Sequence, residues 1–196
     1  KPSSAASDVY KRQDVNEKYI NRYAAEILHS ILGYGVTSKL SQVLREELGF
    51  TSEIGGGIEF SDYAGRMTFE FEVSNINLKD SLQAVFNVIF TAKHGLTEDD
   101  MQSSKVFYTD NQYRLLDDVR ELNFLIGWRC FIENEHICSI DELSEKYFDI
   151  TVNDINEVAK IIFIPQNLMI TVSNDNNRYS KIELSNIFET IRKELL

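Results

Sequence analysis

Proline, cysteine, glycine and tryptophan are scarce in this chain of 196 residues, which contains 2, 2, 9 and 1 of them. So little proline and glycine excludes a collagen-like or proline-rich chain. The cysteines, Cys130 and Cys138, are too few for a disulfide scaffold. No apolar run approaches the ~20 residues of a membrane-spanning helix. Lysine and arginine total 20 against 31 acids, and the net charge of −11 argues against nucleic acid as the main partner.

The rest of the composition is ordinary for a globular protein. Hydrophobic residues make up 43% of the chain and charged residues 26%, which is unlike a disordered chain. The length suits one good-sized domain or two small ones. Because no linker or internal repeat divides the chain, we expect a single domain over residues 14–196.

Residues 1–13 are set apart from that domain. Residues 3–13 read SSAASDVYKRQ, and this string resembles the translation of a transposase-based sequencing adapter. We therefore expect an artefactual leader, which is left out of the fold, and a natural chain that is truncated near Asp14. A fragment of this kind would lack its first strand and expose a sheet edge.

The spacing of apolar residues predicts the elements of an α+β fold. Alternation predicts strands over 50–60 and 66–73, paired as an antiparallel hairpin, and a short apolar strand over 167–173. Three- and four-residue spacing, with capping residues at several starts, predicts helices over 14–32, 38–48, 78–93, 97–134, 139–148, 151–162 and 180–196. The long helix is expected to break before Asn134. The expected architecture is a small, mostly antiparallel sheet with helices packed on one face.

Several groups of residues that could suggest a binding or metal site are better explained by a structural role. The glycines at 33 and 35 and the run Gly55-Gly56-Gly57 predict a turn and a bulge, because neither has the strand-to-helix context of a phosphate-binding loop. His29 and His94 are expected at the surface or rim. The candidates for aromatic core residues are Phe69, Phe71, Phe86, Phe90 and Trp128. The acids and thiol near His136 fit no metal-ligand spacing; they are Glu133, Glu135 and Cys138.

A glycine-rich turn followed by a helix carries a resemblance to a known family. Residues 31–40 read ILGYGVTSKL and residues 43–49 read VLREELG, which resembles the C-terminal repeat unit of the pitrilysin/insulinase family of zinc peptidases. The similarity continues in order through GLTE at 95–98, with Lys105 downstream, and through the segment 150–159 to the strand after Pro165. It covers residues 24 to 174.

The resemblance implies a metal-free half-shell domain of the metallohydrolase fold. Catalysis in the family uses an H-x-x-E-H motif, in which two histidines and a downstream glutamate hold zinc and the motif glutamate activates water. The histidines of this chain are His29, His94 and His136, and none begins that motif. We therefore expect no enzyme activity, catalytic residue, metal ligand or cofactor in this chain alone. The parent protein would be a zinc metalloendopeptidase, with the zinc in a missing catalytic half.

The resemblance also implies a role for the non-catalytic half, which closes the substrate chamber. In the family an arginine, with a tyrosine seven residues later, helps to bind the substrate backbone. Arg45 matches the arginine, but Ser52 stands in place of the tyrosine, and its hydroxyl has a shorter reach and no aromatic face. The prediction is a domain that helps to bind an extended peptide through Arg45 and Ser52. The alternative is a pseudopeptidase scaffold subunit with only a structural or assembly role.

The expected partners follow from the same resemblance. They are a catalytic N-terminal half or partner subunit of the same family and a peptide substrate, with no nucleic acid and no membrane. The compartment stays open, with the cytoplasm as the default, since the expected truncation removes any leader.

Overall fold

The computed structural model describes residues 5–11, 21–60, 64–131, 139–173 and 181–194. Its strands are β1 (Ala5–Lys11), β2 (Ile54–Phe60), β3 (Ala64–Phe71) and β4 (Leu168–Val172). Its α-helices are α1 (Arg22–Gly33), α2 (Leu78–His94), α3 (Glu98–Arg114), α4 (Val119–Phe131), α5 (Ile140–Phe148), α6 (Val152–Ile162) and α7 (Lys181–Glu194). Tighter or wider turns form the π-helix η1 (Ser41–Glu47) and the 3₁₀ helices η2 (Leu115–Asp117) and η3 (Pro165–Asn167). Within these residues no helix is long and apolar enough to cross a membrane.

The described strands form one antiparallel sheet in the order β2-β3-β1-β4. The hairpin of β2 and β3 is in continuous register, from Ile54 opposite Phe71 to Phe60 opposite Gly65. β2 and β4 are therefore the two edges of the described sheet. The α+β class and the predicted hairpin are confirmed.

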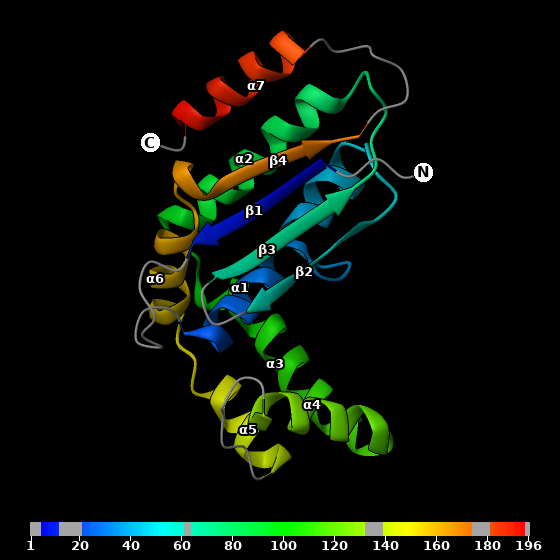
Figure 1. Cartoon of the computed structure of the whole chain (residues 1–196), viewed down its shortest axis with the longest axis vertical. Coiled ribbons are helices and arrows are strands. Elements are labelled where there is room, and N and C mark those ends of the chain that lie inside the picture. The colour runs from blue at the N-terminus through cyan, green and yellow to red at the C-terminus, as the bar shows by residue number, and fades with distance from the viewer. Residues whose placement is uncertain (1–4, 12–20, 61–63, 132–138, 174–180, 195–196) are drawn as a thin grey trace.

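Strand β1 departs from the sequence analysis, which leaves residues 1–13 out of the fold. The backbone of Ala5–Lys11 lies between β3 and β4 and pairs with both (Figure 1). The hydrogen bonds between neighbouring strands are made by backbone groups and not by side chains. A segment whose apolar residues do not alternate can therefore still form a strand. Among the described strands, β1 fills the position between β3 and β4. The strand concerns the fold and not the origin of residues 1–13, so the adapter interpretation stays a hypothesis.

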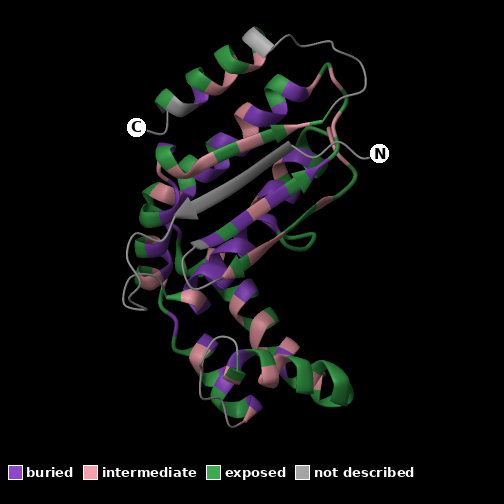
Figure 2. Cartoon of the chain, viewed as in Figure 1, coloured by how far each residue is buried: buried purple, intermediate pink, exposed green. Residues whose placement is uncertain are grey.

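The helices α1 and α2 lie behind the sheet in Figure 1, and the buried residues gather between them and the strands (Figure 2). Strand β3 shows why: Met67, Phe69 and Phe71 are buried, whereas Arg66 and Glu70 on its other face are exposed. This alternation is the one that the sequence predicts for a sheet covered on one face.

Two aromatic residues that were expected in the core are exposed. Phe90 is 42% exposed on α2 and Trp128 is 44% exposed on α4, while Phe86 is buried with Phe69 and Phe71. Figure 2 shows α4 as mostly exposed, at the far end of the molecule from α7. The prediction was wrong for Phe90 and Trp128 because composition does not say which face of a helix meets the sheet.

Three of the predicted helix starts are confirmed by their caps. Thr97 and Thr151 each accept a hydrogen bond from the backbone N–H three residues later, and the acid there bonds back to the cap, which completes a capping box. Ser139 accepts from the N–H of Glu142 at the start of α5. The helix predicted over 14–32 begins at Arg22 in the described part of the chain, with Asn21 as its cap, and residues 14–20 lie outside that part. The helix predicted over 38–48 contains the π-helix η1, whose N-cap residue, Leu40, makes no side-chain cap bond; Ser38 accepts from the N–H of Ser41 at 3.3 Å.

The long helix predicted over 97–134 breaks earlier than expected. α3 ends at Arg114, η2 follows, and Asp118 has an extended backbone and accepts from the N–H groups of Arg120 and Glu121. Asp118 thus caps a new helix, α4. The break expected before Asn134 falls among residues 132–138, outside the described part of the chain.

The glycine run of β2 is a regular part of the strand and not the predicted bulge. Gly56 has φ +134°, and a Cβ built on it would lie 2.0 Å from the carbonyl oxygen of Thr68. The hydroxyl of Thr68 accepts a hydrogen bond from the N–H of Gly57 and donates one to its carbonyl. Glycine is needed here because β2 and β3 approach too closely for a side chain.

Candidate functional site

Arg45 and Ser52, the predicted substrate-binding residues, lie on the approach to β2. Arg45 is on η1, with its side chain 44% exposed and paired with Glu46 at 3.3 Å. Ser52 is exposed in the loop that precedes β2. Within the described residues no hydrogen bond joins the two side chains. The end of η1 is fixed to this loop, since the N–H of Phe50 donates to the carbonyl of Leu44 at 2.8 Å.

The glycine-rich turn at 33–38 is held by α3. Lys39 donates to the carboxylate of Asp100, whose other oxygen caps the N-terminus of α3 with Thr97. Partial burial raises the pKa of Asp100, but the hydrogen bonds from Lys39 and Thr97 outweigh burial and set the pKa below its usual value. Gly33 is required because a Cβ would lie 2.3 Å from the ring of Phe69. The turn that the sequence predicts is thus present, and Gly33 allows the close packing of α1 on the ring of Phe69.

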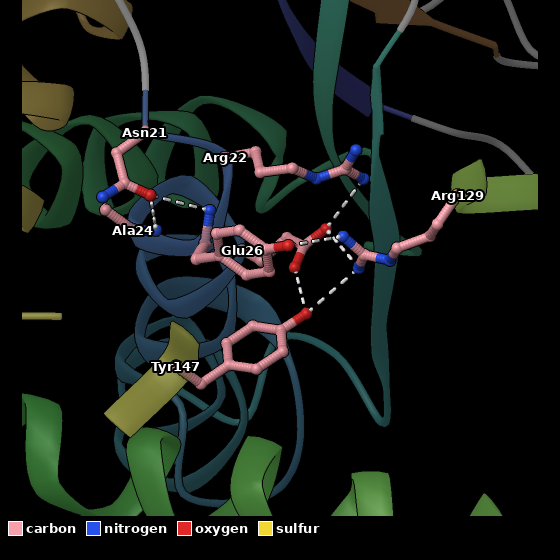
Figure 3. Close-up of polar contacts among 7 residues, drawn as sticks. Asn21, Arg22, Ala24, Glu26, Arg129 and Tyr147 are labelled. Atoms are coloured by element: carbon pink, nitrogen blue, oxygen red, sulfur yellow. Dashed lines mark hydrogen bonds and ion pairs between the residues drawn. The ribbon is translucent and has the colours of Figure 1, made fainter. Parts of the chain in front are cut away.

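A buried cluster of charged and aromatic residues lies where α1, α4 and α5 meet (Figure 3). Glu26 of α1 is 8% exposed and Arg129 of α4 is 5% exposed. Arg22, one turn before Glu26, pairs with it at 3.4 Å, and Arg129 pairs with the same carboxylate oxygen at 3.6 Å. Tyr147 of α5 donates its hydroxyl proton to the other carboxylate oxygen of Glu26. A single carboxylate thereby joins three helices.

Aromatic rings surround this cluster. The hydroxyls of Tyr23 and Tyr147 accept hydrogen bonds from Arg129 at 3.4 and 3.3 Å. The ring of Tyr147 meets Tyr23 edge-on at 5.0 Å and stacks on Tyr108 of α3 at 4.9 Å. Burial, and then the charge of Glu26, raise the pKa values of Tyr108 and Tyr147. Both phenols therefore stay protonated at neutral pH, and Tyr147 acts as a hydrogen-bonding group and not as a base.

A pocket of about 290 Å³ opens beside the cluster. Ile58 of β2, Gln112 of α3 and Phe124 of α4 contribute to its lining, together with Glu26 and Arg129. Neither the cluster nor the pocket was predicted from the sequence. Tyr147 and Glu26 are 121 positions apart, so no local pattern brings them together; the one available signal was charged residues among apolar neighbours in α1 and α4.

His29 is a buried residue, which corrects the expectation of a surface or rim position. Its ring stacks on Phe69 at 5.4 Å, and its Nε2 lies 3.3 Å from the carbonyl oxygen of Thr68. Burial lowers the pKa of His29, although the contact with Thr68 acts in the opposite direction. His94 is exposed at the end of α2, as expected, with Nδ1 2.8 Å from the carbonyl oxygen of Phe90.

The described residues contain no group of three or more histidines, cysteines and acids that could hold a metal ion. The sequence cluster of Glu133, Glu135, His136 and Cys138 lies outside them. The described residues thus place a buried polar network beside a pocket that β2, an edge strand, also lines.

The fold is shared with solved peptidase domains, although neither a family model nor a curated protein matches the sequence. The inactive peptidase domain of a putative zinc protease from Bordetella parapertussis matches 91% of this chain over 96% of its own, with a TM-score of 0.68 and 10% identity. The peptidase M16 inactive domain from Pseudomonas fluorescens matches 87% of this chain, with a TM-score of 0.67 and 16% identity.

A chain of complex III2 from Candida albicans matches all of this chain, with a TM-score of 0.76 and 16% identity. This chain spans less than half the length of that chain and of the Pseudomonas chain, 47% and 41%. At these identities the likeness concerns the fold. The fold of this chain is that of the inactive, non-catalytic domains of putative zinc proteases.

Proposed function

We propose that this chain is the metal-free second half of a zinc metallopeptidase, which closes the substrate chamber over a catalytic half and helps to bind an extended peptide. The observation that carries the proposal is the fold, which is that of domains described as inactive in putative zinc proteases. The sequence agrees, because it contains no H-x-x-E-H motif. The greater length of the matching chains from Candida and Pseudomonas leaves room for a second half.

The edge strand β2 is the surface that we assign to the peptide. It pairs with β3 on one side and with no described strand on the other. An extended peptide adds to such an edge through main-chain hydrogen bonds. Arg45 and Ser52 lie just before this strand, with Arg45 half exposed. We propose that Arg45 donates to peptide carbonyls there and that Ser52 supplies a second, shorter-reaching donor.

A scaffold role is the second candidate. It is supported by the likeness of the whole chain to a chain of complex III2 and by Ser52 in place of the family's tyrosine. In that case the domain would assemble with partners and its β2 edge would be covered by protein and not by substrate.

Calorimetric titration with an extended peptide separates the two candidates. Peptide binding through the β2 edge predicts that affinity is lost when alternate peptide nitrogens are methylated, because these nitrogens donate to the strand. Arg45→Ala should weaken binding about tenfold, whereas Lys160→Ala on α6, a matched loss of one positive charge, should not. Equal affinity for the methylated peptide, or no binding at all, would contradict the proposal and favour the scaffold. Peptide hydrolysis by this chain that a chelator abolishes would contradict both candidates.

A further inference from the structure

The pocket beside β2 contains a polar atom that lacks a partner. Gln112 of α3 is 5% exposed, and its Oε1 is buried with no hydrogen-bond partner among the described residues. Buried acceptors are nearly always bonded, so an unpaired one in a pocket wall suggests the place of a ligand's N–H or O–H donor. Gln112 lines the pocket of about 290 Å³ that also meets β2.

The charges of the lining favour a positive group. Two carboxylates, Glu26 and Glu121, and one guanidinium, Arg129, contribute to the pocket, and the charge of Glu26 is compensated by Arg22 and Arg129, so Glu121 is the charged group that can attract a cation. Glu26 is already bonded to Tyr147 and paired with two arginines. Glu121 is exposed on α4, and no partner of its carboxylate is found in the described part of the chain. The carboxylate of Glu121 and the Oε1 of Gln112 are therefore acceptors that a ligand can use, in a wall that also contains the polar side chains of Asn111 and Tyr108.

The apolar part of the lining fits an aliphatic stem. Ile58 of β2, Leu115 of η2 and Leu125 of α4 contribute to it, with the ring of Phe124. A lysine or arginine side chain combines such a stem with a charged end that donates hydrogen bonds, and its cation is also attracted to an aromatic face. The overall charge of −11 adds a long-range attraction for a basic peptide.

The geometry of the sheet places a peptide side chain over this pocket. Ile58 lies opposite Met67 in the β2–β3 register, and Met67 is buried on the face that the helices cover. Residues opposite each other in neighbouring strands point to the same face. A peptide residue opposite Ile58 on the free side of β2 would therefore point toward the same face, where α3 and α4 line the pocket.

We propose that this pocket receives a lysine or arginine side chain of a peptide that lies along β2, with Gln112 and Glu121 accepting hydrogen bonds from its cationic end. The inference rests on the proposed function, because it takes the peptide on β2 as given. It adds the class of side chain that the site selects.

The test uses three peptides of about ten residues, built from threonine and valine, that differ at one central position: lysine, norleucine or glutamate. Norleucine keeps the aliphatic stem and removes the charge. Fluorescence anisotropy with the full chain should give an affinity about tenfold higher for the lysine peptide than for the norleucine peptide. Gln112→Leu and Glu121→Gln should each bring this ratio close to one, whereas Glu98→Gln at the start of α3, a matched loss of one negative charge, should leave it unchanged.

The outcomes distinguish this inference from the proposed function. Equal binding of the lysine and norleucine peptides would overturn the inference and leave the peptide-binding proposal standing. Tighter binding of the glutamate peptide, or a lysine preference that survives both variants, would also overturn it. Binding of none of the peptides would overturn both proposals. Because Glu121 is exposed, Glu121→Gln keeps the test valid if Gln112→Leu does not fold.

Discussion

Glu26 is an acid in the interior, and its neighbours explain how the fold tolerates it. Two arginines and a phenol share its carboxylate, and one of the arginines, Arg129, is itself only 5% exposed. Burying such charges is costly unless each has a partner. The cluster therefore specifies how α1, α4 and α5 fit together, since other arrangements would leave a buried charge unpaired.

The cluster predicts a large loss of stability on removal of Arg129. Arg129→Met should lower the free energy of unfolding by about 1.5–3 kcal/mol, because it removes the charged donor that bonds to Tyr23 and Tyr147, while Arg22 and Tyr147 still partner Glu26. Arg66→Met is the matched control: it breaks the exposed pair with Glu59 and should cost at most about 1 kcal/mol. Urea unfolding measures both. A similar cost for the two variants would show that the cluster does not hold the helices together.

His29 gives the fold a predictable response to acid. Its pKa lies below its ordinary value of 6.5 in the folded chain, so near and below that pH the unfolded chain binds a proton that the folded chain does not. The free energy of unfolding therefore falls as the pH drops through this range.

The variant His29→Gln should lose less stability than the unaltered chain between about pH 7.5 and about pH 5.5. Urea unfolding at the two pH values tests this, with His94→Gln at an exposed position as the control. An unchanged pH dependence in His29→Gln would contradict the assigned burial of this imidazole.

At the scale of elements, the local signals were sufficient to predict most helices and one hairpin. Thr97, Ser139 and Thr151 carry their caps in their own sequence, and β3 shows its buried face in its alternation. Strand β1 could not be predicted in this way because it has no such alternation and its partners are distant in the sequence. The cluster around Glu26 could not be predicted for the same reason, since its residues come together only when the helices pack.

The glycines of β2 predict opposite responses to the same substitution. Gly56→Ala should lower the free energy of unfolding by at least about 1–3 kcal/mol, because the backbone is in a region that side chains avoid and the Cβ would meet the Thr68 carbonyl. At Gly57 nothing lies within 4 Å of the added Cβ, so Gly57→Ala should be close to neutral. Thermal unfolding of the two variants measures the difference. Equal effects would mean that β2 does not approach β3 as described.

The position of β1 in the sheet predicts the effect of deleting residues 1–13. A chain that begins at Asp14 has no strand between β3 and β4, and β4 then loses its one described strand partner. We expect aggregation or dimerisation, because the freed edges present unpaired backbone groups. Light scattering checks this outcome, and a peptide of residues 3–13 added in trans should restore the monomer. If the chain that begins at Asp14 forms a stable monomer without the added peptide, that result would contradict the placement of β1 between β3 and β4.

At the scale of the whole molecule, the chain combines a sheet covered by helices on one face with an edge strand and a pocket beside it. Figure 1 shows α4 and α5 beyond the β2 side of the sheet, at the opposite end from α7. The free edge of β2 and the pocket near Gln112 thus belong to one side of the molecule. That placement is why we assign one extended ligand to both, with Arg45 and Ser52 preceding β2 in the chain.

The most direct measurement of this assignment is amide hydrogen exchange of the chain with and without saturating lysine peptide. The account predicts slower exchange for the amides of β2, which gain partners in the added strand, and no change for β4 at the other edge. Protection of β4 alone, or of neither edge despite measured binding, would contradict a peptide-binding role for this face of the fold.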